Sequence, residues 1–180
     1  MKKLMIILAI LCLCFPSHAA TMEDIRAEGT CTLEEWSLIV IDRIPVEVVR
    51  LHQLKGGRVT FVEGPLEKKF DYFTPTVLGL YHFRSKHIYV RVWHDVDKNY
   101  GHILAHEYGH FLYHETYTSW PSWVKECIGG YCPGDLDENF AECYAKYCSF
   151  GSLWASDLTA AMEEINRTAD RLYKKTAGLE

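Results

Sequence analysis

The alternation of apolar and polar residues predicts three β-strands in the first half of the chain. Residues 58–63, RVTFVE, alternate as a half-buried strand does and are followed by Gly64-Pro65, which ends the pattern. Two more β-rich runs cover residues 76–83 and 87–93, and the short polar segment 84–86 between them is typical of a hairpin connection. Together the runs predict a small, mostly antiparallel sheet.

Two apolar segments precede these strands. Residues 32–44 start with a threonine that is followed three positions later by Glu35, as in a capping box, and the apolar residues then recur at helical spacing up to Pro45. We expect a helix there. Residues 46–54 are also apolar, but the run is too short for its periodicity to distinguish a helix from a strand.

After the strands, three longer segments space their apolar residues three or four positions apart, as amphipathic helices do. They are residues 99–115, 135–150 and 158–173. Between the first two, residues 116–134 are rich in Trp, Pro, Gly and Cys and show no period, so we expect a long loop. A sheet that is followed by helices is the pattern of an α+β fold, with the first of these helices packed on the sheet.

The first of the three helices contains the sequence HEYGH at residues 106–110, which is the H-E-x-x-H pattern of zinc-binding helices. Positions four apart lie on one face of a helix, so His106 and His110 can direct their imidazoles at one metal ion, with Glu107 beside them. His114 lies ~12 Å along the axis from His106, too far for both to bind one ion directly. We expect His114 to be a surface residue or to support a ligand.

A catalytic zinc needs three protein ligands and an open position. The metzincin continuation requires Gly at position 113 and His at 116, and the Tyr113 and Thr116 of this chain exclude that class. The second helix offers Glu138 and Glu142, which are four apart and share a face. One can bind zinc while the other accepts the free ring N–H of a ligating histidine. The alternatives are a cap for Glu138 and a solvated helix face for Glu142.

The sequence HEYGH followed by ENFAE resembles the gluzincin metalloproteases of the anthrax lethal factor catalytic-domain type, to which the secreted clostridial proline-proline endopeptidases are also similar. The resemblance covers roughly residues 78–150 and implies a zincin-like fold. It also implies that His106, His110 and Glu138 are the ligands of a Zn²⁺ ion.

Two supporting roles follow from the same resemblance. Glu142 is expected to support a ligating histidine. Tyr131, seven residues before Glu138, is expected to stabilise the oxyanion of the reaction as a catalytic residue. The alternative interpretation of Tyr131 is a packed loop aromatic.

The expected function is that of a zinc metallopeptidase. It would hydrolyse peptide bonds of a peptide or protein substrate with zinc-activated water, and Glu107 would be the general base. The substrate would lie extended along the edge of the sheet at residues 77–81. Two alternatives are a secreted, disulfide-stabilised binding module without catalysis and a zinc hydrolase that acts on cell-wall peptides.

The length of 180 residues and the 48% hydrophobic content suit one domain. Residues 1–19 combine two lysines, an apolar run shorter than the ~20 residues of a membrane span, and a small-residue cleavage site, which is the pattern of a signal peptide. We therefore expect one secreted or periplasmic domain, residues 20–180, that is monomeric and has no stable membrane anchor. Cleavage leaves 17 Lys and Arg against 24 Asp and Glu, a net charge of −7, which argues against a nucleic-acid partner.

Five cysteines remain after cleavage, and an oxidising compartment favours disulfide bonds. Four of them flank the proposed zinc site, so we expect two disulfides among Cys127, Cys132, Cys143 and Cys148, with Cys31 unpaired. The sequence leaves the pairing open. The C-x4-C spacing of the first two does not match a zinc ribbon.

Overall fold

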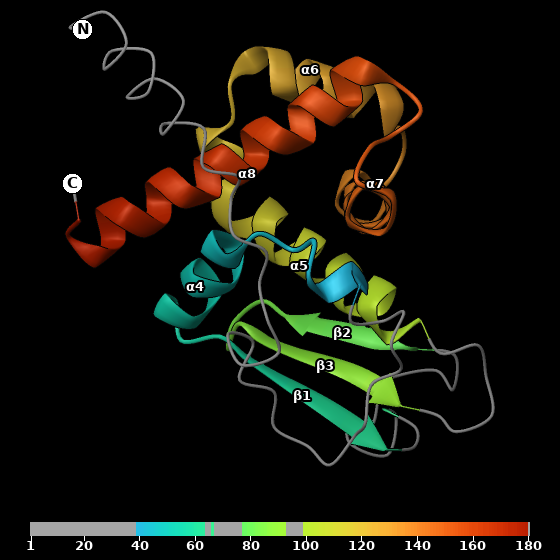
Figure 1. Ribbon diagram of the computed structural model, residues 1–180, viewed down its shortest axis with the longest axis vertical. Coiled ribbons are helices and arrows are strands. Elements are labelled where there is room, and N and C mark those ends of the chain that lie inside the picture. Colours follow the sequence, from blue (N-terminus) through green and yellow to red (C-terminus); the bar gives the residue numbers. More distant parts are fainter. Residues whose placement is uncertain (1–38, 64–65, 67–76, 93–98, 180) are drawn as a thin grey trace, which may run out of the picture.

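The computed structural model describes residues 39–63, 66, 77–92 and 99–179, and its elements are labelled in Figure 1. In chain order they are α4 (Val46–Leu54), β1 (Arg58–Glu63), β2 (Gly79–His82), β3 (His87–Val92), α5 (Tyr100–Thr116), the 3-10 turn η2 (Tyr117–Ser119), α6 (Ser122–Tyr131), α7 (Leu136–Phe150) and α8 (Ser156–Ala177). The predicted α+β class is confirmed. The expected signal peptide, Cys31 and the start of the expected helix at residue 32 lie outside the described residues.

The sheet is mixed rather than mostly antiparallel. Its strand order is β1-β3-β2, with β2 antiparallel and β1 parallel to the central strand β3. The hairpin at residues 84–86 is as expected, and Lys86 in its turn has a φ of 58°. The expectation failed for β1 because alternation within a strand reports which side chains are buried but not which strand is the partner.

Helix α5 lies between the sheet and the helices α7 and α8 (Figure 1). Its first turn is capped by Asn99, whose side-chain oxygen accepts the N–H of His102 at 2.8 Å. The predicted apolar stripe is fully buried, at Leu104, Tyr108, Phe111 and Leu112. Each such side chain contributes roughly 1.5–3 kcal/mol, so this stripe holds the motif helix firmly against the core.

Helices α5 and α7 approach closely at one point. A Cβ atom added at Gly109 would lie 2.6 Å from the Cα of Ala141, which is closer than any real Cβ contact. Gly109 directly precedes His110, and Ala141 directly precedes Glu142. The two smallest residue types therefore stand where the motif helix meets the glutamate-bearing helix, and they allow the two sets of functional side chains to meet.

The segment 116–134 is largely helical, which corrects the expectation of a loop. Trp120 and the α6 residues Val124 and Ile128 are buried, and α6 contacts α8. Only two residues of α6 are fully buried, and its last turn contains Gly129 and Gly130, so its helical signal in the sequence is weak.

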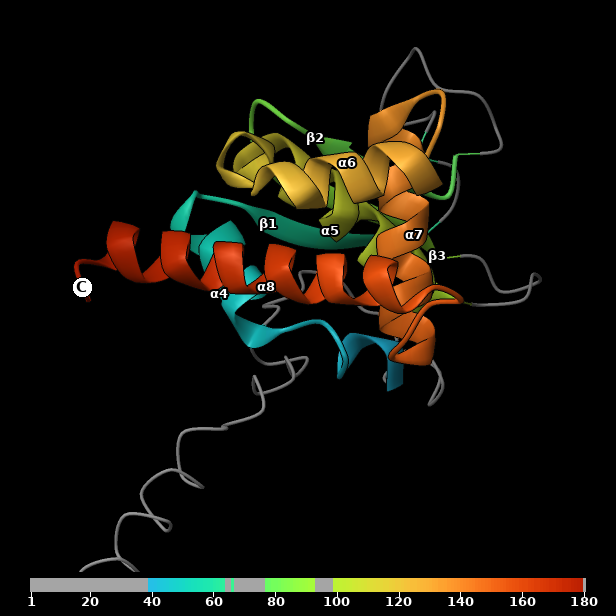
Figure 2. The same ribbon diagram turned by 90° about the horizontal axis from the view of Figure 1, so that it is seen from above.

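Helix α8 crosses the molecule and contacts both α4 and α6 (Figure 2). It is longer than the expected 158–173, and the apolar residues predicted for its inner face are buried except for the partly buried Leu172. The ambiguous segment 46–54 is a helix, α4, which packs on α8. In the described part of the chain, no helix has the length and apolar character needed to span a membrane.

Candidate metal centre

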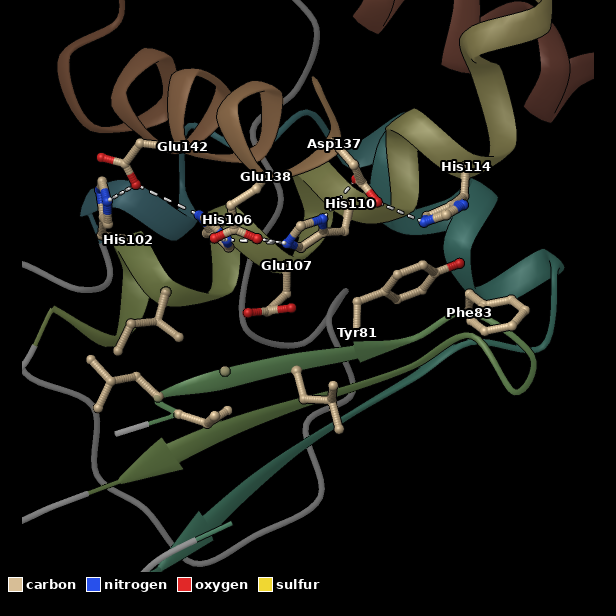
Figure 3. A pocket seen from close by; sticks show the side chains of 15 residues that line it. Tyr81, Phe83, His102, His106, Glu107, His110, His114, Asp137, Glu138 and Glu142 are labelled. Atoms are coloured by element: carbon tan, nitrogen blue, oxygen red, sulfur yellow. Dashed lines mark hydrogen bonds and ion pairs between the residues drawn. The ribbon is translucent and has the colours of Figure 1, made fainter. Parts of the chain in front are cut away.

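Three side chains from α5 and α7 converge on one point (Figure 3). The Nε2 atoms of His106 and His110 are 3.1 Å apart. The carboxylate of Glu138 reaches both rings, with one oxygen 3.2 Å from Nε2 of His106 and the other 3.3 Å from Nε2 of His110. Within the described residues, this is the group of His, Cys, Asp and Glu side chains that could hold a metal ion.

The geometry of this triangle fits a bound metal. Two ligand atoms held at about 2.0–2.1 Å from one ion in a tetrahedral arrangement are about 3.3–3.4 Å apart. The three edges of 3.1, 3.2 and 3.3 Å are close to that value. Two imidazole nitrogens and a carboxylate are also the donors of catalytic metal sites that keep a position open.

The other nitrogen of each ligand ring faces a carboxylate. Nδ1 of His110 is 2.8 Å from Oδ1 of Asp137, and Nδ1 of His106 is 3.6 Å from Oε2 of Glu142. An N–H that donates from Nδ1 leaves Nε2 with its lone pair free for a metal. Both carboxylates therefore favour the ring tautomer that metal binding needs, and the contact of Asp137 is the closer one.

Asp137 serves two histidines at once. Its second oxygen is 2.9 Å from Nε2 of His114, one helical turn beyond His110. Burial alone would raise the pKa of Asp137, but the hydrogen bonds from His110 and His114 outweigh burial and lower it. Asp137 is thus an anion at neutral pH, and it links His114 to His110.

The two ligand rings have opposite pKa shifts. Burial lowers the pKa of His106, and the neighbouring His110 lowers it further. Burial also acts to lower the pKa of His110, but its hydrogen bond to Asp137 and the surrounding carboxylates raise the pKa overall. The surrounding carboxylates therefore favour the protonated form of His110.

Glu107 lies on the side of α5 that faces β2 and is 4% exposed. Its carboxyl group accepts the backbone N–H of Tyr81, and burial raises its pKa to about 8. A Cβ added at Gly79 would lie 2.3 Å from Oε1 of Glu107, so β2 comes close to this carboxyl group because residue 79 is glycine.

All these groups line one pocket of about 580 Å³, bounded by β2 on one side and by α5 and α7 on the other (Figure 3). The wall on the strand side is apolar and the wall on the helix side carries the titratable groups. The lining residues are Val77, Leu78, Gly79, Leu80, Tyr81, Phe83, His102, Ile103, His106, Glu107, His110, His114, Asp137, Glu138 and Glu142.

Glu142 lies at one end of the pocket and contacts several side chains. Its Oε2 is 3.5 Å from Nε2 of His102, and its Oε1 is 3.2 Å from Nζ of Lys146. Burial would raise its pKa, but Lys146 and His102 outweigh burial and lower it. Glu142 therefore stays ionised beside His106, although its longer distance makes the support weaker than that of Asp137.

Tyr131 is not among the residues that line the pocket. It is the last residue of α6, is 39% exposed, and donates its hydroxyl to the carboxylate of Asp157 at 3.1 Å. Its ring contacts Trp154. Because the segment before α7 is a helix rather than a loop over the site, its final residue faces α8 instead of the metal centre.

The described cysteines form no disulfide bond with one another, but one pair of them lies close together. All four cysteines in the described residues are free thiols. The sulfurs of Cys132 and Cys143 are 3.2 Å apart, whereas Cys148 is buried and bonds to Tyr144.

No sequence motif marks Asp137 as a partner of the histidines, although the spacing of the histidines indicates that such a partner can exist. His110 and His114 are four positions apart, so one acid placed opposite them can bond to both. The ENFAE motif begins at the adjacent Glu138 and does not include Asp137, so it points to Glu138 alone.

No protein-family model matches this chain, and a comparison with curated proteins finds no relative.

Proposed function

We propose that the chain is a zinc-dependent endopeptidase of zincin-like fold that is secreted or periplasmic. The observation that carries the proposal is the triangle of His106, His110 and Glu138, whose three edges match those of a tetrahedral site. The imidazole and carboxylate donors favour zinc over the hard cations Ca²⁺ and Mg²⁺, which prefer oxygen ligands alone.

Zinc bound by these residues supplies Lewis acidity, which polarises a carbonyl group and lowers the pKa of water. Glu107 is the general base of the proposed reaction. A pKa raised by burial lets its carboxyl group take a proton from the attacking water and release it to the leaving amine near neutral pH. The backbone N–H of Tyr81 holds this carboxyl group in the pocket.

The edge strand β2 is the proposed substrate-binding strand. Leu78 accepts the N–H of Arg91 in β3 at 2.7 Å, so in this antiparallel pair the backbone groups of Leu78 and Leu80 face β3. Those of the intervening Gly79 face away from β3. An extended peptide can pair with that edge, which places its backbone beside Glu107.

A metal analysis tests the first part of the proposal. The purified protein should bind about one zinc per chain, and Glu138→Gln should lose most of it. A protein that takes up no zinc would favour the alternative of a non-catalytic binding module.

A variant of the base tests the second part. Glu107→Gln should keep its zinc and lose cleavage of a peptide library by a factor of about 10² or more. Glu126→Gln, on the exposed side of α6, is the matched control and should cleave like the unmodified protein. Undiminished cleavage by the Glu107 variant would refute the assignment of the base, and activity limited to cell-wall peptides would favour the other zinc hydrolase.

A further inference from the structure

A pair of close thiols, Cys132 and Cys143, has no part in the proposed reaction. Cys132 directly follows the last residue of α6, and Cys143 lies in the middle of α7. Their sulfurs are 3.2 Å apart, and the side chains are buried, at 2% and 7% exposure. The two sulfurs would have to move only ~1.2 Å closer to reach the S–S distance of a disulfide.

The chain between the two cysteines carries the three carboxylates of α7 that face the histidines of the metal centre. The cysteines are 11 positions apart, and the intervening segment contains Asp137, Glu138 and Glu142. A covalent bond between the ends of this segment would therefore enclose the third ligand and both residues that orient the histidines.

Noncovalent contacts hold the start of this segment at present. Asp135 caps α7 through a long 3.4 Å bond to the N–H of Glu138, and the side chain of Asn139 donates to the carbonyl of Pro133 at 2.5 Å. Gly134 has a φ of +93°, which lets the chain turn sharply between α6 and α7. These contacts order the segment without fixing its ends to each other.

We propose that Cys132 and Cys143 form a disulfide bond that closes this segment and holds its three carboxylates in place for the metal. The bond itself does not depend on the proposed function. Its effect on metal affinity does, because that effect requires a metal at the triangle of His106, His110 and Glu138.

The chemistry is thiol–disulfide exchange with a small-molecule or protein disulfide as the oxidant. The hydrogen bond with Cys132, which can donate to the Cys143 thiolate, lowers the pKa of Cys143, and Cys143 is also the more exposed of the two. The Cys143 thiolate attacks the oxidant to give a mixed disulfide and one thiol. Cys132 then attacks Sγ of Cys143 and releases the second thiol. Two protein thiols are oxidised, and the oxidant disulfide is reduced to two thiols that carry the two protons.

The other two cysteines are poorer partners. Cys148 is 1% exposed, burial raises its pKa to about 12, and it bonds to Tyr144. Cys127 is half-buried on α6, and burial raises its pKa as well. Oxidation should therefore produce one intramolecular bond, between Cys132 and Cys143, rather than the two expected from the sequence.

Peptide mapping tests the bond directly. The full chain is incubated with glutathione disulfide, the remaining thiols are alkylated, and the unreduced digest is analysed by mass spectrometry. The expected result is a linked pair of peptides that contain Cys132 and Cys143, with Cys127 and Cys148 alkylated. A digest with both Cys132 and Cys143 alkylated, or with either linked to another cysteine, would overturn the proposal.

Unfolding in urea tests the strength of the constraint. Closing a loop of about 12 residues should lower the unfolding equilibrium constant about 100-fold on oxidation, by the chain-entropy estimate. The Cys132→Ala/Cys143→Ala variant should show no such difference between glutathione disulfide and reduced glutathione. The matched Cys127→Ser/Cys148→Ala variant should keep it, and a protein whose stability is the same in both buffers would contradict the constraint.

Zinc affinity tests the link to the metal centre. Competition with a chromogenic chelator should give at least a severalfold lower zinc dissociation constant for the oxidised protein than for the reduced one, because ordering the ligand segment is then less costly. Equal affinity in both states would refute the link while leaving the proposed zinc site standing. Failure to bind zinc in either state would instead refute the proposed function and leave the mapped disulfide untouched.

Discussion

Replacing Asp137 by Asn should weaken zinc binding more than any other single change to a residue that is not itself a ligand. Asn has nearly the same shape and keeps one oxygen acceptor, but it has no charge. The 2.8 Å contact with Nδ1 of His110 would change from a charge-assisted hydrogen bond to a neutral one, and the contact with His114 would weaken in the same way.

The size of the loss follows from these contacts. A hydrogen bond to a charged group contributes about 1.5–3 kcal/mol against about 1 kcal/mol for a neutral one, and loss of a carboxylate behind a ligating histidine typically lowers metal affinity 10–100-fold. Glu142 lies 3.6 Å from His106, beyond ordinary hydrogen-bond distance, and is also paired with Lys146. We therefore expect about 10–100-fold for Asp137→Asn and less than about tenfold for Glu142→Gln.

Competition with a chelator at constant pH measures both dissociation constants. Asp135→Asn is the matched control, since it removes a charge from the same end of α7 while retaining a side chain that can cap the helix. Its zinc affinity should stay within about twofold. A larger loss of zinc affinity for Glu142→Gln than for Asp137→Asn would refute the view that the closer carboxylate contributes more to zinc binding.

Three further predictions concern stability and the role of one tyrosine. Gly109→Ala should lower the free energy of unfolding in urea by about 1–3 kcal/mol, because the added Cβ collides with the backbone of Ala141. Gly129→Ala, with open space around the added Cβ, should be neutral or stabilising, and equal effects of the two changes would contradict this explanation. Burial lowers the pKa of His52 from 6.5 to about 4. The neutral ring therefore contributes fully to the free energy of unfolding above pH 6.5, and about 3 kcal/mol of that free energy is lost as the pH falls from 6.5 to 4. His52→Gln should give a shallower loss over the same range, and identical pH profiles would count against it. Tyr131→Phe should leave kcat/KM unchanged within about twofold, and a loss of tenfold or more would restore its expected role in oxyanion stabilisation.

Local sequence patterns were sufficient for the elements that carry the motifs. The apolar stripe of α5 includes Leu104 and Phe111, which are fully buried, and the same helical period places His106 and His110 on the opposite side of the helix. A helix is determined largely by contacts within a few residues, so its faces can be read from spacing alone. The pairing of Glu138 with these histidines also follows from spacing once both helices are known.

The features that the sequence patterns did not indicate all concern relations between distant segments. Whether β1 pairs parallel or antiparallel with β3 is not encoded in the alternation of its own residues. The side chain of Tyr131 faces Asp157 because α6 docks on α8, and that docking rests on only two fully buried α6 residues. The bond of Asp137 to two histidines similarly depends on how α7 is rotated about its axis.

The close contact between Gly109 and Ala141 also has a thermodynamic consequence for metal uptake. Backbone packing at this contact sets the distance between the two helices, and with it the separations of 3.1–3.3 Å among the ring nitrogens of His106 and His110 and the carboxylate of Glu138. A metal that enters such a site moves the chain little. Calorimetry should therefore record a heat-capacity change near zero on zinc binding, as opposed to the large negative value that accompanies folding around a metal.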